Sequence, residues 1–98
     1  MTLSKKIEHI LRQRFSPTFL EIIDESSQHA HHGTGEKKGG NYQVTIVSQL
    51  FTEKSSLQRQ REVYQALSKE FSLNEIHALV IHAYTPEQWK AFSNLKSG

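Results

Sequence analysis

"IHALVIHAYTPEQW", residues 76–89, joins a long apolar run to the start of a helix. The run over residues 76–84 is apolar enough to predict a strand that is buried on both faces. Thr85, Pro86 and Glu87 then follow in the order that helix starts favour: a capping hydroxyl, a proline in the first turn and an acidic side chain. The stretch therefore predicts a strand that leads directly into a C-terminal helix.

Upstream of this stretch, residues 55–71 repeat apolar side chains at helical spacing, with Ser55 or Ser56 as the N-cap. The expected buried face of this helix comprises Leu57, Val63, Tyr64, Leu67 and Phe71. Residues 42–48 and 19–26 are short, rich in Ile, Leu and Val, and predict two strands. Apolar residues recur at helical spacing from Leu3 to Phe15, and the following Ser-Pro ends that helix because the residue before proline avoids the α region.

The predicted element order is therefore α-β-β-α-β-α. The first two strands form an antiparallel hairpin, and a right-handed crossover through the long helix makes the last two strands parallel. This order predicts an α+β fold with a mixed three-stranded sheet and helices packed on one face. A chain of 98 residues is long enough for a single domain over residues 1–98, with one modest core.

Composition removes several classes of function. With no cysteine, the chain has no disulfide, no thiolate zinc site and no thiol nucleophile. A net charge of +2 gives no strong global field for DNA, so nucleic-acid binding would need a local basic patch. The sequence lacks a phosphate loop and a nucleophile motif, which argues against an enzyme. It also lacks a membrane-spanning run, so a cytoplasmic location with no membrane partner is the default expectation.

Histidines supply the candidate metal ligands. His29, His31 and His32 lie in the glycine-rich stretch between the first two strands, and imidazole suits Fe, Zn, Cu and Ni. Taken alone, the same stretch is more typical of a polar, solvated loop. His77 lies in the last strand on the side of Leu79, where a histidine is more often a satisfied core residue than a ligand.

Basic residues supply a second candidate surface. Lys54, Arg59 and Arg61 lie at the start of the long helix, and Lys37 and Lys38 lie in the glycine-rich loop. Together they could contact nucleic-acid phosphates. The alternative is a solvated helix face, because acidic residues are interspersed among them.

Two blocks of sequence resemble the BolA family. The first block is matched by Ser48, Phe51, Lys54, Ser55, Leu57, Arg59, Arg61, Val63, Tyr64 and Leu67, and the second by Ile76, His77, Ala78, Leu79, Thr85, Pro86 and Trp89. Three positions depart from the family pattern: Gln60 stands where histidine is usual, Glu53 replaces a common turn glycine, and Asn41 lies where relatives often carry histidine. The resemblance implies a fold similar to the class II KH domain.

The resemblance also implies two kinds of function. Members of this family partner monothiol glutaredoxins and share or transfer a [2Fe-2S] cluster, together with glutathione. The histidine of the Ile-His-Ala-Leu motif is then a ligand, which carries to His77. The second ligand comes from the loop between the first two strands, where only His29, His31 and His32 are available in this cysteine-free chain.

The alternative function implied by the resemblance is a DNA-binding transcriptional regulator of stress response and cell morphology. The G-x-x-G loop by which KH domains grip nucleic acid is absent from the sequence. Any DNA contact is therefore expected from Lys37, Lys38, Lys54, Arg59 and Arg61.

Overall fold

The computed structural model describes residues 2–26 and 39–97. The elements run in the order α1 (Leu3–Phe15), β1 (Phe19–Asp24), β2 (Gly40–Val47), a short 3-10 turn η2 (Gln49–Phe51), α2 (Ser56–Ala66), α3 (Ser68–Ser72), β3 (Ile76–Tyr84) and α4 (Pro86–Ser97). The α+β class predicted from the sequence is confirmed. No helix in these two ranges combines the length and the apolar character needed to cross a bilayer.

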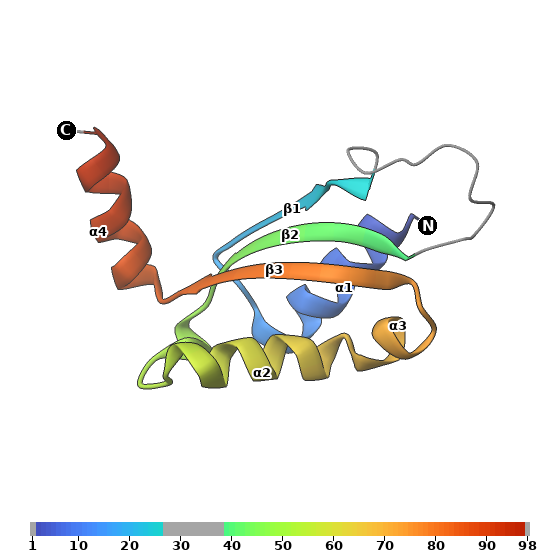
Figure 1. Ribbon diagram of the computed structural model, residues 1–98. Helices are drawn as coiled ribbons and strands as arrows, with labels where there is room; N and C mark the ends of the chain where they lie inside the picture. Colours follow the sequence, from blue (N-terminus) through green and yellow to red (C-terminus); the bar gives the residue numbers. More distant parts are fainter. Residues whose placement is uncertain (1, 27–38, 98) are drawn as a thin grey trace.

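The sheet has the strand order β1-β2-β3. The β1 and β2 strands are antiparallel, whereas β2 and β3 are parallel, as the sequence predicted. Figure 1 shows α2 and α3 on one side of the sheet, while α4 projects from the end of β3 on the other side. Trp89 of α4 stacks on Phe19 of β1 with ring centroids 5.0 Å apart, so α4 covers only one end of that second face.

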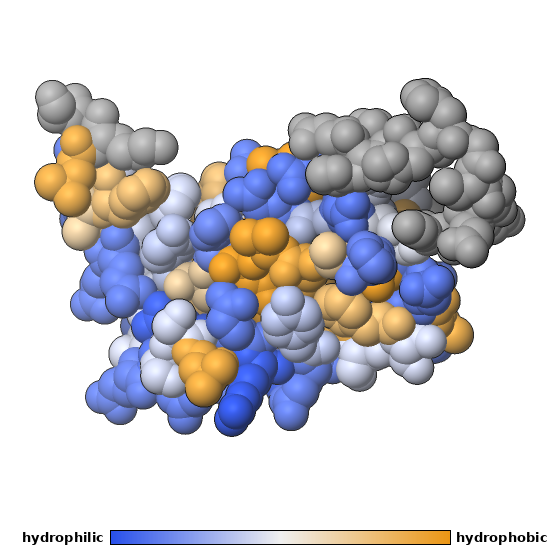
Figure 2. Space-filling view, in the orientation of Figure 1, coloured by the Kyte–Doolittle hydropathy of each residue, from blue (hydrophilic) through white to orange (hydrophobic). Residues whose placement is uncertain are grey.

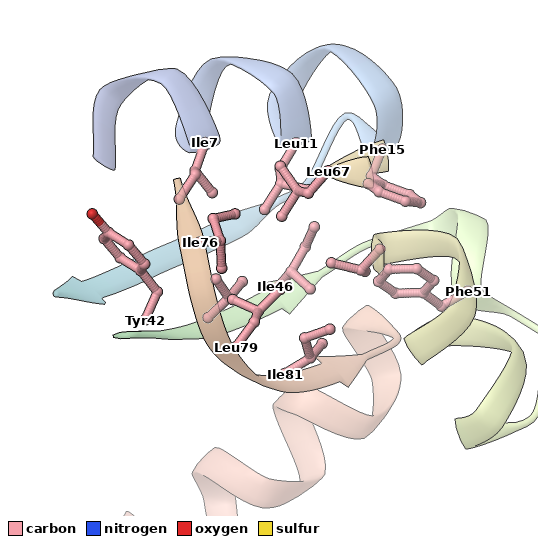
Figure 3. Packing of buried hydrophobic residues seen from close by; sticks show 12 residues of the cluster. Ile7, Leu11, Phe15, Tyr42, Ile46, Phe51, Leu67, Ile76, Leu79 and Ile81 are labelled. Atoms are coloured by element: carbon pink, nitrogen blue, oxygen red, sulfur yellow. The ribbon is translucent and has the colours of Figure 1, made fainter. Parts of the chain in front are cut away.

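One hydrophobic core lies between the sheet and the helices α1 and α2. Figure 3 shows Ile7, Leu11 and Phe15 of α1 pointing toward the inner face of the strands. Ile46 of β2 and Ile81 of β3 are buried in the same cluster. Burial of each such side chain stabilises the fold by about 1.5–3 kcal/mol, so this cluster fixes how the helices sit on the sheet.

Side-chain caps explain where the helices begin. Ser55 accepts a hydrogen bond from the backbone N–H of Gln58, whose side-chain oxygen in turn accepts from the backbone N–H of Ser55, at 3.1 and 2.8 Å. Thr85 and Gln88 form the same reciprocal pair at the start of α4, at 3.1 and 3.0 Å. Such capping boxes satisfy backbone donors that the first helical turn leaves unpaired, and both lie where the sequence predicted helix starts.

The prediction that residues 76–84 form a strand buried on both faces is wrong. Leu79 and Ile81 are buried, but Val80 between them is 51% exposed. The strand lies at the edge of the sheet, and the described helices leave most of its outer face uncovered. Figure 2 shows the resulting hydrophobic area near the middle of β3.

The predicted buried face of the long helix is also partly wrong. Leu57 is 59% exposed and Tyr64 is 40% exposed, whereas Arg59 and Val63 are buried. The helix also breaks at Leu67, so that α3 is a separate turn of helix. The side chains of Arg59 and Tyr64 bind carbonyl oxygens at the edge of β3. The face that α2 turns toward the sheet therefore differs from the apolar face that its sequence spacing predicted.

Candidate functional site

The described residues that flank the histidine-bearing segment lie at the end of the sheet where β3 begins. This follows from the topology, because β1 ends where the parallel strands β2 and β3 start. The backbone N–H of Glu25 donates to the carbonyl oxygen of Asn41 at 2.8 Å, and the backbone N–H of Asn41 donates to the hydroxyl of Ser26 at 3.0 Å. The two stems of the connection are thus tied together at this end.

The second stem packs directly against the backbone that precedes His77. A Cβ atom on Gly39 would lie 2.6 Å from the carbonyl oxygen of Asn74 and 2.8 Å from the backbone nitrogen of His77. The backbone N–H of Gly40 donates to the carbonyl oxygen of Glu75 at 2.9 Å. Only glycine allows this approach, so the stem and His77 are held side by side.

His77 lies at an irregularity in β3. Gly40 pairs with Ile76, but Asn41 pairs with Ala78, so one extra residue is inserted into β3 at this point. The shift turns Ile76 into the core and leaves His77 exposed. The prediction that His77 shares the side of Leu79 rested on unbroken alternation and is wrong for this reason.

The His77 imidazole makes no hydrogen bond or ion pair to any residue within 2–26 or 39–97. By contrast, Nε2 of His82 lies 3.1 Å from the side-chain nitrogen of Gln43 on the outer face of the sheet. An exposed imidazole without a partner keeps a nitrogen lone pair for an external ligand. The alternative that His77 is a satisfied core residue does not fit this geometry.

The other predicted metal ligands and two of the predicted phosphate contacts lie outside the described residues. These are His29, His31, His32, Lys37 and Lys38. Within the described ranges, no three histidine, aspartate or glutamate side chains lie close enough to hold a metal ion. His77 is therefore not part of a three-residue metal site formed by described residues alone.

The basic residues of α2 occupy three different environments. Arg59 is only 8% exposed, and its guanidinium donates to the carbonyl oxygens of Lys54 and Ala83 at 3.0 and 3.1 Å. Lys54 forms an ion pair with Glu62 at 2.6 Å. Arg61 is exposed and has no ion-pair partner among the described residues. The predicted surface is therefore not continuous, because Arg59 points inward as a structural residue.

The outer edge of β3 is occupied by α2, which the sequence did not indicate. Outward-facing carbonyl oxygens of β3 accept hydrogen bonds from the side chains of Arg59, Gln60 and Tyr64. The Gln60 side chain donates to the carbonyl oxygen of Ile81 at 2.8 Å, and the Tyr64 hydroxyl donates to that of Leu79 at 2.9 Å. The departure at Gln60 thus supplies a donor to the strand edge.

Three charged side chains fix the turn before β3 against α1. The ammonium of Lys6 lies 3.2 Å from a carboxylate oxygen of Glu75 and 3.5 Å from one of Glu70, which is 2% exposed. The hydrogen bond to Glu75, followed by its negative charge and by Glu70, raises the pKa of Lys6 against the opposing effect of desolvation. The cluster supports the backbone two residues before His77.

Comparisons with known proteins agree with this architecture. The family model described as BolA-like protein matches residues 11–88. The "DNA-binding transcriptional regulator BolA" of Escherichia coli (strain K12) is 36% identical to this chain over 96% of the chain and 86% of the relative. "BolA-like protein 1" of Mus musculus is 42% identical over 82% of this chain and 56% of the relative. These names describe a regulator and a BolA-like protein and do not denote an enzyme.

Solved structures share the fold. The "BolA domain of SufE1 from Arabidopsis thaliana" aligns with a TM-score of 0.78 and 33% identity, covering 90% of this chain and 96% of that chain. A "bol-like protein" from Babesia bovis aligns with a TM-score of 0.77 and 33% identity, covering 95% of each chain. The likeness to class II KH domains stays a prediction.

Proposed function

Because this chain belongs to the BolA family, we propose that it is a non-enzymatic, cytoplasmic partner of a monothiol glutaredoxin. In this role it shares or receives a [2Fe-2S] cluster, with His77 as one ligand. The observation that carries the proposal is the position of His77: its side chain is exposed, and its backbone nitrogen lies against Gly39, which directly follows the segment that bears His29, His31 and His32. One of these three is the second ligand in this proposal.

The chemistry of the available donors fits this role. Without cysteine, the chain can offer a cluster no thiolate, and the histidine nitrogens are its ligands suited to iron. Thiolates from the glutaredoxin and from glutathione would complete the coordination, and histidine ligation raises the potential of a [2Fe-2S] centre relative to ligation by thiolates alone. In this proposal such a mixed centre is cargo passed between two proteins.

The test is a titration of this protein into glutaredoxin loaded with a [2Fe-2S] cluster, followed by visible absorption and circular dichroism. Wild-type protein is expected to change both spectra, and the His77→Ala variant is expected to lose the change. His9→Ala is the matched control, because His9 is an exposed histidine on α1 and is not one of the predicted ligands. Single alanine variants of His29, His31 and His32 then identify the second ligand. Unchanged wild-type spectra, or a His77→Ala variant that behaves as wild type, would contradict the proposal.

DNA binding is a second candidate function. It is favoured by the name of the Escherichia coli relative, whose similarity covers 96% of this chain. Among the predicted contacts within the described ranges, Arg61 is exposed without an ion-pair partner, whereas Lys54 is paired with Glu62. Lys37 and Lys38 are the contacts that this candidate adds from the loop.

A duplex-binding titration at two salt concentrations tests this candidate. Removing one side chain that binds a phosphate is expected to reduce the slope of log affinity against log salt by about one. Arg61→Ala and the paired variant Lys37→Ala, Lys38→Ala should both lower this slope, and Lys90→Ala on α4 is the control. Binding that is insensitive to salt and to all of these variants would refute the proposed contacts.

A further inference from the structure

The two edges of the sheet differ in whether their outward backbone groups are already hydrogen-bonded, and this decides where a partner strand could add. At the β3 edge, Arg59, Gln60 and Tyr64 of α2 bind the outward carbonyl oxygens. At the β1 edge, no residue within the described ranges donates to or accepts from the outward backbone groups. Figure 1 shows β1 on the side of the sheet away from α2.

The register identifies the free backbone groups of β1. The backbone N–H of Glu25 donates to the carbonyl oxygen of Asn41, and Ile23 lies opposite Gln43 in the same ladder. In an antiparallel pair, alternate residues direct their N–H and C=O groups toward the partner strand. The groups of Leu20, Ile22 and Asp24 therefore point away from β2, toward solvent.

A cleft follows this edge on the helix side of the sheet. It has a volume of about 270 Å³ and lies between α1 and β1. Its walls are formed by Thr2, Ser4, Lys5, Glu8, Leu20 and Ile22. An added strand would direct every second side chain into this cleft, where Leu20 and Ile22 offer an apolar surface.

The exposed side chains of β1 indicate the charge of the occupant. Glu21 and Asp24 are exposed, and neither they nor Glu25 forms an ion pair within the described ranges. Opposite charges on neighbouring strands stabilise a pair, and like charges opposite each other destabilise it. A second copy of β1 would bring two sets of these acids onto one ribbon, so a basic segment fits better than self-pairing.

We propose that β1 is a docking edge for an extended, basic segment of another protein, which adds to the sheet as a fourth strand. Apolar residues of that segment face the cleft between α1 and β1, and its Lys or Arg residues face Glu21 on the outer side. This edge does not include His77 and does not depend on cluster binding.

The probe is the peptide KVKVKVK, blocked at both ends, titrated into ¹⁵N-labelled protein and followed by NMR. We expect the amide signals of Leu20, Ile22 and Asp24 to shift and their hydrogen exchange to slow. A control peptide N-methylated at its valines keeps the charge but cannot donate to β1, and it should bind about tenfold more weakly or worse. The variant His77→Ala should bind the probe like wild type.

Protein variants complete the test. Ile22→Pro deletes an outward N–H that β2 does not use, and it should abolish binding. Glu21→Gln combined with Asp24→Asn should weaken binding, whereas Glu87→Gln on α4 should not. If Ile22→Pro fails to fold, the comparison of the two peptides on the wild-type protein shows whether backbone hydrogen bonds to β1 are needed for binding.

Four outcomes would overturn the proposal: no shifts at millimolar peptide, shifts centred on another surface, equal binding of the N-methylated peptide, or a dimer formed through β1 without peptide.

Discussion

Arg59 of α2 donates a hydrogen bond of 3.1 Å to the carbonyl oxygen of Ala83 on the outer edge of β3. The same nitrogen also donates to the side-chain oxygen of Gln88 at 2.7 Å, and Nε donates to the carbonyl oxygen of Lys54 at 3.0 Å. One buried guanidinium thus joins the turn before α2, the end of β3 and the first turn of α4. The arginine that the sequence offered as a phosphate contact is a structural link between three segments.

Arg59→Met should therefore destabilise the fold. Methionine keeps much of the side-chain volume but leaves the carbonyl oxygens of Lys54 and Ala83 without this donor and removes one of the two donors to the Gln88 side chain, at an expected cost of about 2–4 kcal/mol in the free energy of unfolding. Urea denaturation measures this cost. The exposed Arg61→Met variant is the control and should stay within about 0.5 kcal/mol of wild type. Equal effects of the two variants would refute the structural role of Arg59.

Gln60→Leu and Gln60→His should differ in stability, because residue 60 contacts the same edge of β3. Leucine removes the donor to the carbonyl oxygen of Ile81 and should lower the unfolding free energy by about 1 kcal/mol. Histidine, the residue common at this position in the family pattern, also carries an N–H donor and should retain more of the stability. The prediction fails if both variants lose the same stability in urea.

Gly39→Ala should disturb the backbone beside His77. The added methyl group meets backbone atoms of Asn74 and Ile76 at 2.6 and 2.9 Å, which cannot rotate away as a side chain would. We expect a loss of about 1–3 kcal/mol in unfolding free energy. Amide signals from Asn74 to His77 should shift in NMR spectra, and unchanged signals there would contradict the packing of the stem.

Glu53→Gly should stabilise the protein. Glu53 has a φ of 64°, in the left-handed region, where a side chain costs about 1–2 kcal/mol and glycine is nearly free of this cost. Glycine also gives the unfolded chain more freedom, so we expect a net gain of about 0.5–1 kcal/mol. Thr52→Gly is the control, because Thr52 has a φ of −59° and its replacement should destabilise. A fall in melting temperature for Glu53→Gly would refute the strain.

Stability should decline at alkaline pH. The hydrogen bond with Glu75 is the largest cause that raises the pKa of Lys6, and burial, followed by the charge of Asp24, raises the pKa of Tyr42. The folded protein therefore holds both protons more tightly than the unfolded chain, so this stability is present below the ordinary values of about 10 and is lost as pH rises through the raised values.

Urea denaturation between about pH 8 and 12 measures this decline. Tyr42→Phe and Glu75→Gln should each flatten the curve, because each removes one cause of proton retention. A wild-type stability that rises with pH above about 10 would contradict both assignments.

Local signals in the sequence predicted most of the fold. The capping hydroxyls of Ser55 and Thr85 lie where the helices begin, and the Ser-Pro pair after Phe15 lies where α1 ends. The crossover rule predicted the parallel pairing of β2 and β3. These features depend on neighbours in sequence or on general rules of chain connection, which a single sequence can carry.

Long-range features could not be predicted in the same way. The register shift that exposes His77 arises from the pairing of β3 with Gly40 and Asn41, far away in sequence. The burial of Arg59 depends on the carbonyl oxygen of Ala83, which lies 24 positions further along the chain. The basic residues in the sequence predicted a phosphate-binding surface, but the contacts that each side chain makes in the fold decide which of them can still bind a phosphate.

The occupied edge of β3 also sets a limit on assembly. A sheet that grows by adding strands needs a free edge on each member so that the next chain can attach. In this protein α2 blocks the β3 edge, and within the described ranges only β1 offers open backbone groups. Copies of this chain therefore could not add strands through the β3 edge as well as through β1, which works against open-ended stacking into fibres.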